Sequence, residues 1–211
     1  MKIVVGMATT RQREDFAKIA VLSLLNQVDE IHVYNNDNEA MNYTDNAKFY
    51  ALQNYKEPIY YFSCDDDIHY PTDYVETMIE GIERTNTIVT HHGRTLLGRD
   101  RNYYRGHQGY RCLDENKYEG NIRVAGTGVT AFRTDYFNPT EIYKAKDKRM
   151  SDLVFSLEAA KQGKQITILK HPQGWIKDLR VPTALSIAHM ERRNTRQNEL
   201  ANQIYDLRTN I

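Results

Sequence analysis

The feature that most constrains the fold of this chain is an alternation of short apolar runs with helical segments over residues 2–90. Runs at 2–7, 30–35, 58–64 and 87–90 predict strands, and the run at 58–64 is apolar on nearly every residue, as expected of a strand covered on both faces of a sheet. Segments at 12–27 and 39–55, and a third that Pro71 opens, are predicted helices. This order favours the α/β class, with a mostly parallel central sheet and helices on both faces.

The second half of the chain has a different composition. Residues 94–121 are polar, rich in Tyr and Arg and without a clean period, so we predict a long loop or an irregular hairpin there. Short strands are expected at 122–124, 129–133 and 165–169, with a helix at 151–162 and a peripheral helix in the tail at 192–208. We expect one domain over 1–211, with a nucleotide-binding half (1–92), an acceptor and catalytic half (93–189) and a tail helix (190–211).

Bulk properties exclude several classes of protein. The 28 basic and 28 acidic residues cancel, so net charge favours neither nucleic acid nor membrane as a partner. No signal peptide or transmembrane segment is predicted, which indicates a cytoplasmic protein. Cys64 and Cys112 lack metal-site spacing and are interpreted as reduced thiols. Motifs of the types GxGxxG, GxxxxGK[ST] and GxSxG are absent, which disfavours dinucleotide oxidoreductases, P-loop enzymes and α/β-hydrolases.

Three adjacent carboxylates, Asp65, Asp66 and Asp67, follow the apolar run that ends at Cys64. In open α/β sheets, ligands bind beyond the carboxyl ends of the strands, where these side chains are expected. A divalent cation with oxygen ligands, Mg²⁺ or Mn²⁺, would offset their repulsion. In an extended segment Asp65 and Asp67 point the same way and Asp66 the other. The alternative interpretation is a solvated acidic turn.

This segment, FSCDDDIHYPTDYVETMI, resembles the aspartate-rich DxD segment of the GT-A glycosyltransferases, especially those of the family-two type. Four further segments resemble that family in the same order: VVGMATTRQR, AVLSLLNQVDEIHVYNND, GTGVTAFRTDYF and MSDLVFSLEAAKQGK. The resemblance covers roughly residues 2–169. It implies a Rossmann-like GT-A domain that transfers a sugar, with Mn²⁺ or Mg²⁺, from a nucleotide-sugar donor, usually a UDP-sugar, to an acceptor hydroxyl.

The resemblance also implies roles at the donor end of the site. Asp67 is the expected direct metal ligand, and Asp65 binds metal, ribose or sugar, with Asp66 able to exchange roles with either. Thr9, Arg11 and Arg13 follow the first strand, where this family holds the nucleotide, and guanidinium groups pair with phosphate or stack on uracil. Asp37 matches the acid that contacts the base or ribose. The alternatives are a solvated helix start for the arginines and an Asx turn for Asp37.

At the acceptor end, Asp152 matches the family's general base, which takes the acceptor proton while configuration inverts. Ser151 stands where the family often has glutamate, and Asp152 in the alternative only complements the helix dipole. His189, with His171 second, is the candidate late histidine ligand of the metal, although a lone histidine is often a packed or surface residue. Trp175 is expected to stack on a sugar or to fill the core.

Two rival functions remain at this stage. Nucleotidyl transfer also uses clustered aspartates and a metal, although the segment after the first strand has only one glycine. A non-catalytic sugar or nucleic-acid binding module would rely on the Tyr/Arg-rich segment 102–118. The acceptor is open: a glycan, a lipid-linked saccharide, a protein or a modified DNA base, with residues 94–121 and the tail as its expected platform. The oligomeric state is unknown from sequence.

Overall fold

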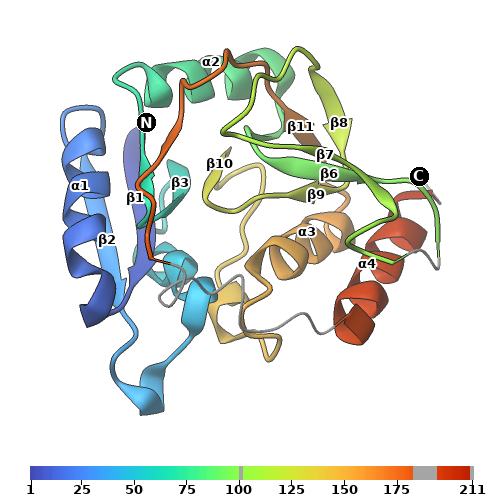
Figure 1. The fold of residues 1–211 in the computed structure, drawn as a ribbon, viewed down its shortest axis with the longest axis horizontal. Helices are drawn as coiled ribbons and strands as arrows, with labels where there is room; N and C mark the ends of the chain where they lie inside the picture. The colour runs from blue at the N-terminus through green and yellow to red at the C-terminus, as the bar shows by residue number, and fades with distance from the viewer. Residues whose placement is uncertain (100–101, 183–193, 210–211) are drawn as a thin grey trace.

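The computed structural model describes residues 1–99, 102–182 and 194–209. Over these residues, the centre is a seven-stranded sheet in the order β2-β1-β3-β10-β5-β11-β8 (Figure 1). Its strands are β1 (Lys2–Thr9), β2 (Glu30–Asn35), β3 (Ile59–Asp65), β5 (Ile88–Thr90), β8 (Gly120–Ile122), β10 (Val129–Arg133) and β11 (Ile166–Ile168). β1, β2, β3, β5 and β11 share one direction, and β8 and β10 oppose them. The α/β class with a mostly parallel sheet is confirmed.

Helices cover both faces of the sheet because alternate side chains of its inner strands point to opposite sides. Val5 and Phe62 lie in a core with α1 (Glu14–Leu24) and α2 (Tyr74–Thr85). Val4 and Tyr61 lie in a second core, with the 3₁₀ helix η3 (Thr44–Asn54) and α3 (Ser151–Lys161). Burial of each large apolar side chain contributes about 1.5–3 kcal/mol. These two cores explain why β1 and β3, the strands between them, are mostly apolar and buried.

The strand β10 gives the sheet its mixed character and shapes the site. It lies between β3 and β5 and is antiparallel to both, with Val129 opposite Cys64. The start of an antiparallel strand lies beside the end of its neighbour, so the turn at 126–128 is brought to the carboxyl end of β3. The acidic segment and the glycine-bearing turn are therefore neighbours in space.

The helix predicted at 39–55 is present, but it is divided in two and has 3₁₀ geometry. The two 3₁₀ helices are η2 (Glu39–Met41) and η3, and Thr44, the first residue of η3, has φ 55°. The Asn36 amide donates to the Thr44 carbonyl at 2.9 Å, and the Asn42 side chain accepts from the Thr44 N–H at 2.9 Å. Asparagine side chains of this kind compete with helical backbone bonds. At the first helix, residues 11–13 likewise form a 3₁₀ turn, η1 (Arg11–Arg13), before α1 begins.

The segment 94–121 contains the predicted irregular hairpin. Its strands β6 (Gly93–Leu96) and β7 (His107–Tyr110) are antiparallel, and β9 (Val124–Ala125) completes a small three-stranded sheet. The single strand predicted at 122–124 is divided between β8 and β9, which belong to different sheets. The remaining short elements are β4 (Ile68–His69), β12 (Lys177–Asp178) and the 3₁₀ helix η4 (Ile142–Lys144).

The predicted tail helix is present as α4 (Asn194–Thr209), which packs on α3 beside the small sheet (Figure 1). It is less peripheral than expected, because Leu200 and Ile204 are buried in a third core with Leu153 and Leu157. Both cysteines are free and buried, as predicted. Among the described residues, no helix has the length and apolarity needed to cross a membrane.

Candidate functional site

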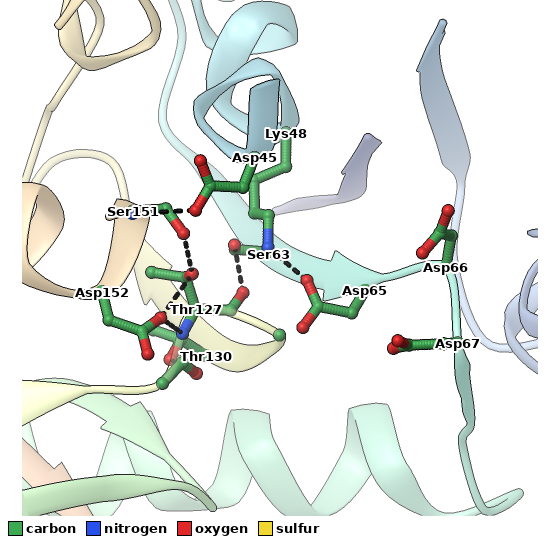
Figure 2. Close-up of polar contacts among 12 residues, drawn as sticks. Asp45, Lys48, Ser63, Asp65, Asp66, Asp67, Thr127, Thr130, Ser151 and Asp152 are labelled. Carbon is green, nitrogen blue, oxygen red and sulfur yellow. Dashed lines mark hydrogen bonds and ion pairs between the residues drawn. The ribbon is translucent and has the colours of Figure 1, made fainter. Parts of the chain in front are cut away.

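A pocket of about 600 Å³ opens at the carboxyl ends of β1 and β3. Ligands of open α/β sheets bind at this edge, and the volume is within the range of small-molecule sites. Figure 2 shows Asp152 on one side of Asp65, with Asp66 and Asp67 on the other. The predicted site residues that line this pocket are Thr9, Arg13, Asp65, Asp66, Asp67 and Asp152.

Asp66 is the most buried of the three adjacent carboxylates, and both of its oxygens accept hydrogen bonds. Thr9 Oγ1 donates to Asp66 Oδ2 at 2.7 Å. Arg13 Nη2 lies 2.5 Å from Asp66 Oδ1 and 2.8 Å from Asp67 Oδ2. Burial raises the pKa of Asp66, and the charge of Arg13 opposes that rise. Asp66 therefore fixes the end of β3 to the segment that follows β1.

Asp65 is paired with Lys48, a buried residue of η3 that points across the sheet toward it (Figure 2). Burial lowers the pKa of Lys48, but the neighbouring carboxylates, Asp65 first, raise it above its usual value. Lys48 thus stays charged inside the protein. Gly128 leaves the room for this arrangement, since a Cβ atom there would lie 2.1 Å from Asp65 Oδ2.

The repulsion within the acidic segment is thus offset by two protein cations, Arg13 and Lys48. The negative charge of Asp67 is only partly compensated, because burial and the adjacent Asp65 carboxylate raise its pKa to about 6. From the sequence pattern alone, we expected a metal ion to offset the repulsion among the three carboxylates. The structure adds the side-chain cations, which sequence reasoning missed in the case of Lys48.

The fit of this segment to a divalent cation rests on Asp65 and Asp67. Among the described residues, no three His, Cys, Asp or Glu side chains are placed to hold a metal together. Mg²⁺ at nucleotide sites, however, is held by one or two carboxylates together with phosphate and water. Asp65 Oδ2 and Asp67 Oδ1 accept no hydrogen bond from the described residues, so this pair fits that type of site.

Asp152 lies in the first turn of α3, where the helix dipole favours an anion. Its Oδ1 atom accepts from the Thr127 N–H and from Thr127 Oγ1, both at 2.8 Å. Asp45, another residue missed from sequence, accepts from the Ser151 N–H at 2.9 Å and so caps α3. Asp152 Oδ2 accepts no hydrogen bond from the part of the chain that is described. One oxygen therefore holds the carboxylate in place and the other is open to a ligand.

Arg11 and Asp37 are near each other but outside the pocket lining. The Asp37 carboxylate accepts from the Arg11 N–H at 3.0 and 3.1 Å, which caps the turn η1. Both side chains are exposed. The exposed Arg11 side chain is consistent with the solvated helix start considered above, whereas the Asp37 carboxylate caps η1 and does not form an Asx turn. Contact of either residue with a nucleotide stays a prediction.

The candidate histidine ligands lie elsewhere or outside the described part of the chain. His189 falls within 183–193, which is outside the described residues. His171 is buried, with its Nδ1 atom 3.2 Å from His91 Nδ1, and it does not line the pocket. Trp175 packs against His91 and Tyr74, and its Nε1 donates to Asp73 at 2.9 Å. Trp175 is thus a packing residue, as one of the two interpretations proposed.

Fold and site together define an α/β domain with a charged small-molecule pocket at the carboxyl edge of its sheet. The chain matches no protein-family model and no curated protein. Among solved structures, it is similar to the inositol-1-phosphate CTP transferase from T. maritima, with a TM-score of 0.39 and 13% sequence identity. That similarity covers 94% of this chain and 76% of the other. A TM-score of this size indicates a distant likeness, so the function rests on the site itself.

Proposed function

We propose that this chain is a glycosyltransferase that transfers a sugar from a UDP-sugar to an acceptor hydroxyl, within one domain over 1–211. The observation that carries the proposal is that one pocket holds both the acidic segment Asp65–Asp67 and a separately anchored carboxylate, Asp152. A leaving diphosphate needs compensation of its charge, and an attacking hydroxyl needs a base. The two groups of carboxylates suit these two tasks.

At the donor end, Arg13 and Lys48 are the cations that contact the acidic segment and would contact a diphosphate bound beside it. They are now paired with carboxylates, and phosphate oxygens would share them. Asp65 and Asp67 would hold Mg²⁺ or Mn²⁺, which when bound neutralises charge on the diphosphate as a Lewis acid. Thr9 and Asp66 keep the segment after β1 in place, so the donor end is preorganised.

At the acceptor end, Asp152 Oδ2 accepts the proton of the attacking hydroxyl. The acceptor oxygen bonds to the anomeric carbon as the bond from that carbon to the phosphate oxygen breaks, and the nucleoside diphosphate leaves. Attack from the face opposite the phosphate inverts the configuration. Thr127 fixes the orientation of the base by occupying Asp152 Oδ1. The acceptor stays among glycans, lipid-linked saccharides, proteins and modified DNA bases.

Nucleotidyl transfer is the second candidate, and the presence of two cations, Arg13 and Lys48, beside the acidic segment favours it. A triphosphate carries more negative charge than a diphosphate, and it would pair with both of these cations. The bond broken would then join the α- and β-phosphates, and pyrophosphate would leave. The two functions therefore differ in their inorganic product.

The test is to incubate the purified protein with UDP- and GDP-sugars, and separately with CTP or UTP plus sugar 1-phosphates, each with and without Mn²⁺ or Mg²⁺. Metal-dependent release of UDP from a UDP-sugar supports glycosyl transfer. Release of pyrophosphate supports nucleotidyl transfer instead. If no donor is bound or cleaved under any condition, both enzyme proposals are wrong and a non-catalytic binding module is favoured.

A further inference from the structure

One end of the pocket has no role in the donor chemistry above. Its lining residues are Arg94 on β6, Tyr103 and Tyr104 in the segment before β7, and Gln197 on α4. This end adjoins Asp152, because Tyr103 packs in one core with Leu153, the neighbour of Asp152 in α3, and Asp152 lines the same pocket. These residues therefore lie on the side of the pocket from which an acceptor would reach the base.

Gln197 has an unused hydrogen-bond acceptor that is buried in this region. The residue is 5% exposed, and its Nε2 atom donates to the Tyr104 hydroxyl at 2.7 Å. Its Oε1 atom has no hydrogen-bond partner among the described residues. Buried polar atoms are normally satisfied, and an orphaned one is unfavourable. A hydroxyl or amide donor on a ligand would complete the bonding of Gln197.

Arg94 contributes an uncompensated positive charge to the same end. Its guanidinium lies over the Tyr103 ring, 4.6 Å from the ring centroid, which holds the side chain in place. No carboxylate of the described residues forms an ion pair with it. Arg94 is only half-buried, and it lines the pocket. A guanidinium placed in this way suits a carboxylate or a phosphate.

We propose that Arg94, Tyr104 and Gln197 form an acceptor subsite for a sugar that carries an anionic group. Arg94 would pair with the anion, and Gln197 Oε1 would accept from a sugar hydroxyl. Tyr104 presents a partly exposed ring as an apolar surface with a polar rim. The inference rests on the proposed glycosyltransferase function, and it narrows the acceptor to acidic saccharides.

The experiment measures binding of glucuronate, glucose 6-phosphate and glucose to the full chain by saturation-transfer NMR titration, with UDP and Mg²⁺ present. We expect at least one charged probe to bind about tenfold more tightly than glucose, since hydrogen bonds to charged groups are the stronger ones. Glucuronate and glucose 6-phosphate separate a carboxylate from a phosphate as the recognised group. Arg94→Met should abolish this preference, and Gln197→Met should weaken all three probes severalfold.

Arg105→Met and Gln203→Met are the matched controls, because both residues are exposed and lie outside the pocket lining. Arg94→Lys keeps the charge if Arg94→Met fails to fold, and it should retain part of the preference. Equal affinity for charged and neutral probes, or unchanged binding in the Arg94 variants, would overturn the inference. A repeat of the titration without UDP is the second control: charged probes that bind only when UDP is absent would also overturn the inference, since they would then occupy the donor end.

UDP binding, measured separately by calorimetry, distinguishes this failure from that of the proposed function. If the wild-type chain binds UDP with Mg²⁺ but shows no preference for acidic sugars, only the subsite inference is wrong. If it does not bind UDP, the donor proposal fails, and with it the acceptor role given to this subsite.

Discussion

At the scale of residues, the charges at the end of β3 are arranged so that each carboxylate shares a cation. Arg13 contacts two of the aspartates and Lys48 the third. A diphosphate entering the pocket would draw these cations toward itself and leave the carboxylates free for a metal. Because these side chains are already ordered in the ligand-free protein, they would lose little conformational entropy when a ligand binds.

Lys48→Met is the first prediction. The change leaves the Asp65 carboxylate beside Asp67 without its cation, so we expect the free energy of unfolding to fall by about 1–2 kcal/mol, less than for a fully buried pair because Asp65 is partly exposed. UDP binding should weaken about tenfold, as expected for a lost hydrogen bond to a charged group. Urea denaturation and calorimetry measure the two effects.

A double-mutant cycle with Asp65→Asn provides the control for this prediction. The double variant should be more stable than the sum of the two single changes indicates, because the pair is removed together. Strict additivity would contradict the claim that these two side chains compensate each other.

Asp152→Asn is the second prediction at this scale. The amide oxygen can still accept from Thr127, so the helix start and the donor end should be unchanged. The base is lost, and kcat should fall by about 10²–10⁴-fold with little change in UDP affinity. Initial rates with a UDP-sugar and calorimetry with UDP give the two quantities. Unchanged transfer would remove Asp152 from the role of base.

At the scale of elements, the site depends on how closely β10 approaches the end of β3. The backbone N–H of Asp65 and the carbonyl of Gly128 are 3.4 Å apart, and the Tyr70 hydroxyl donates to the same carbonyl at 2.7 Å. These contacts hold the turn at 126–128 close to the Asp65 side chain. The turn also carries Thr127, which holds Asp152, so one element adjusts both groups of carboxylates.

Gly128→Ala is the prediction for this element. The added methyl group would meet the Asp65 carboxylate at 2.1 Å, so the carboxylate must move away from Lys48. We expect weaker metal-dependent UDP binding, by about tenfold, as for the loss of one charge-assisted contact. Gly109→Ala is the control, because its nearest contacts are ordinary at 3.5 Å. Equal UDP affinity of Gly128→Ala and wild type would contradict this account of the turn.

At the scale of the whole molecule, stability should depend on pH through His91, which is buried beside the His171 ring. Burial, and then the His171 ring, lower the pKa of His91 to about 3. An unfolded histidine titrates near 6.5, so between about pH 6.5 and pH 3 the unfolded chain binds a proton that the folded chain does not. This contribution therefore destabilises the fold as pH falls below about 6.5.

The measurement is the free energy of unfolding at pH 7, 6, 5 and 4 for the wild type and for His91→Gln. The wild type should lose up to about 1.4 kcal/mol per pH unit more than the variant, since all other titrating groups are common to both. Parallel pH profiles would show that His91 is not the group responsible.

The sequence predicted the strands and most helices because periodic burial determines both pattern and structure. It did not predict that the helix at 39–55 is divided into two 3₁₀ helices, where Asn36 and Asn42 form side-chain bonds to the backbone. The antiparallel direction of β10 could not be predicted from the sequence either, since a short apolar run is compatible with both strand directions. Lys48 and Asp45 escaped detection because their partners, Asp65 and Ser151, are brought near only by the tertiary fold.

The pocket draws on side chains as distant in the chain as Thr9 and Gln197. During synthesis, the residues at 9–67 leave the ribosome long before α4 does. A nascent chain would therefore expose the donor-side residues early, and it would acquire the far wall of the pocket only when α4 docks on α3. Until then, a donor bound to the nascent chain would be exposed to bulk water. The order of translation therefore delays the completion of the pocket.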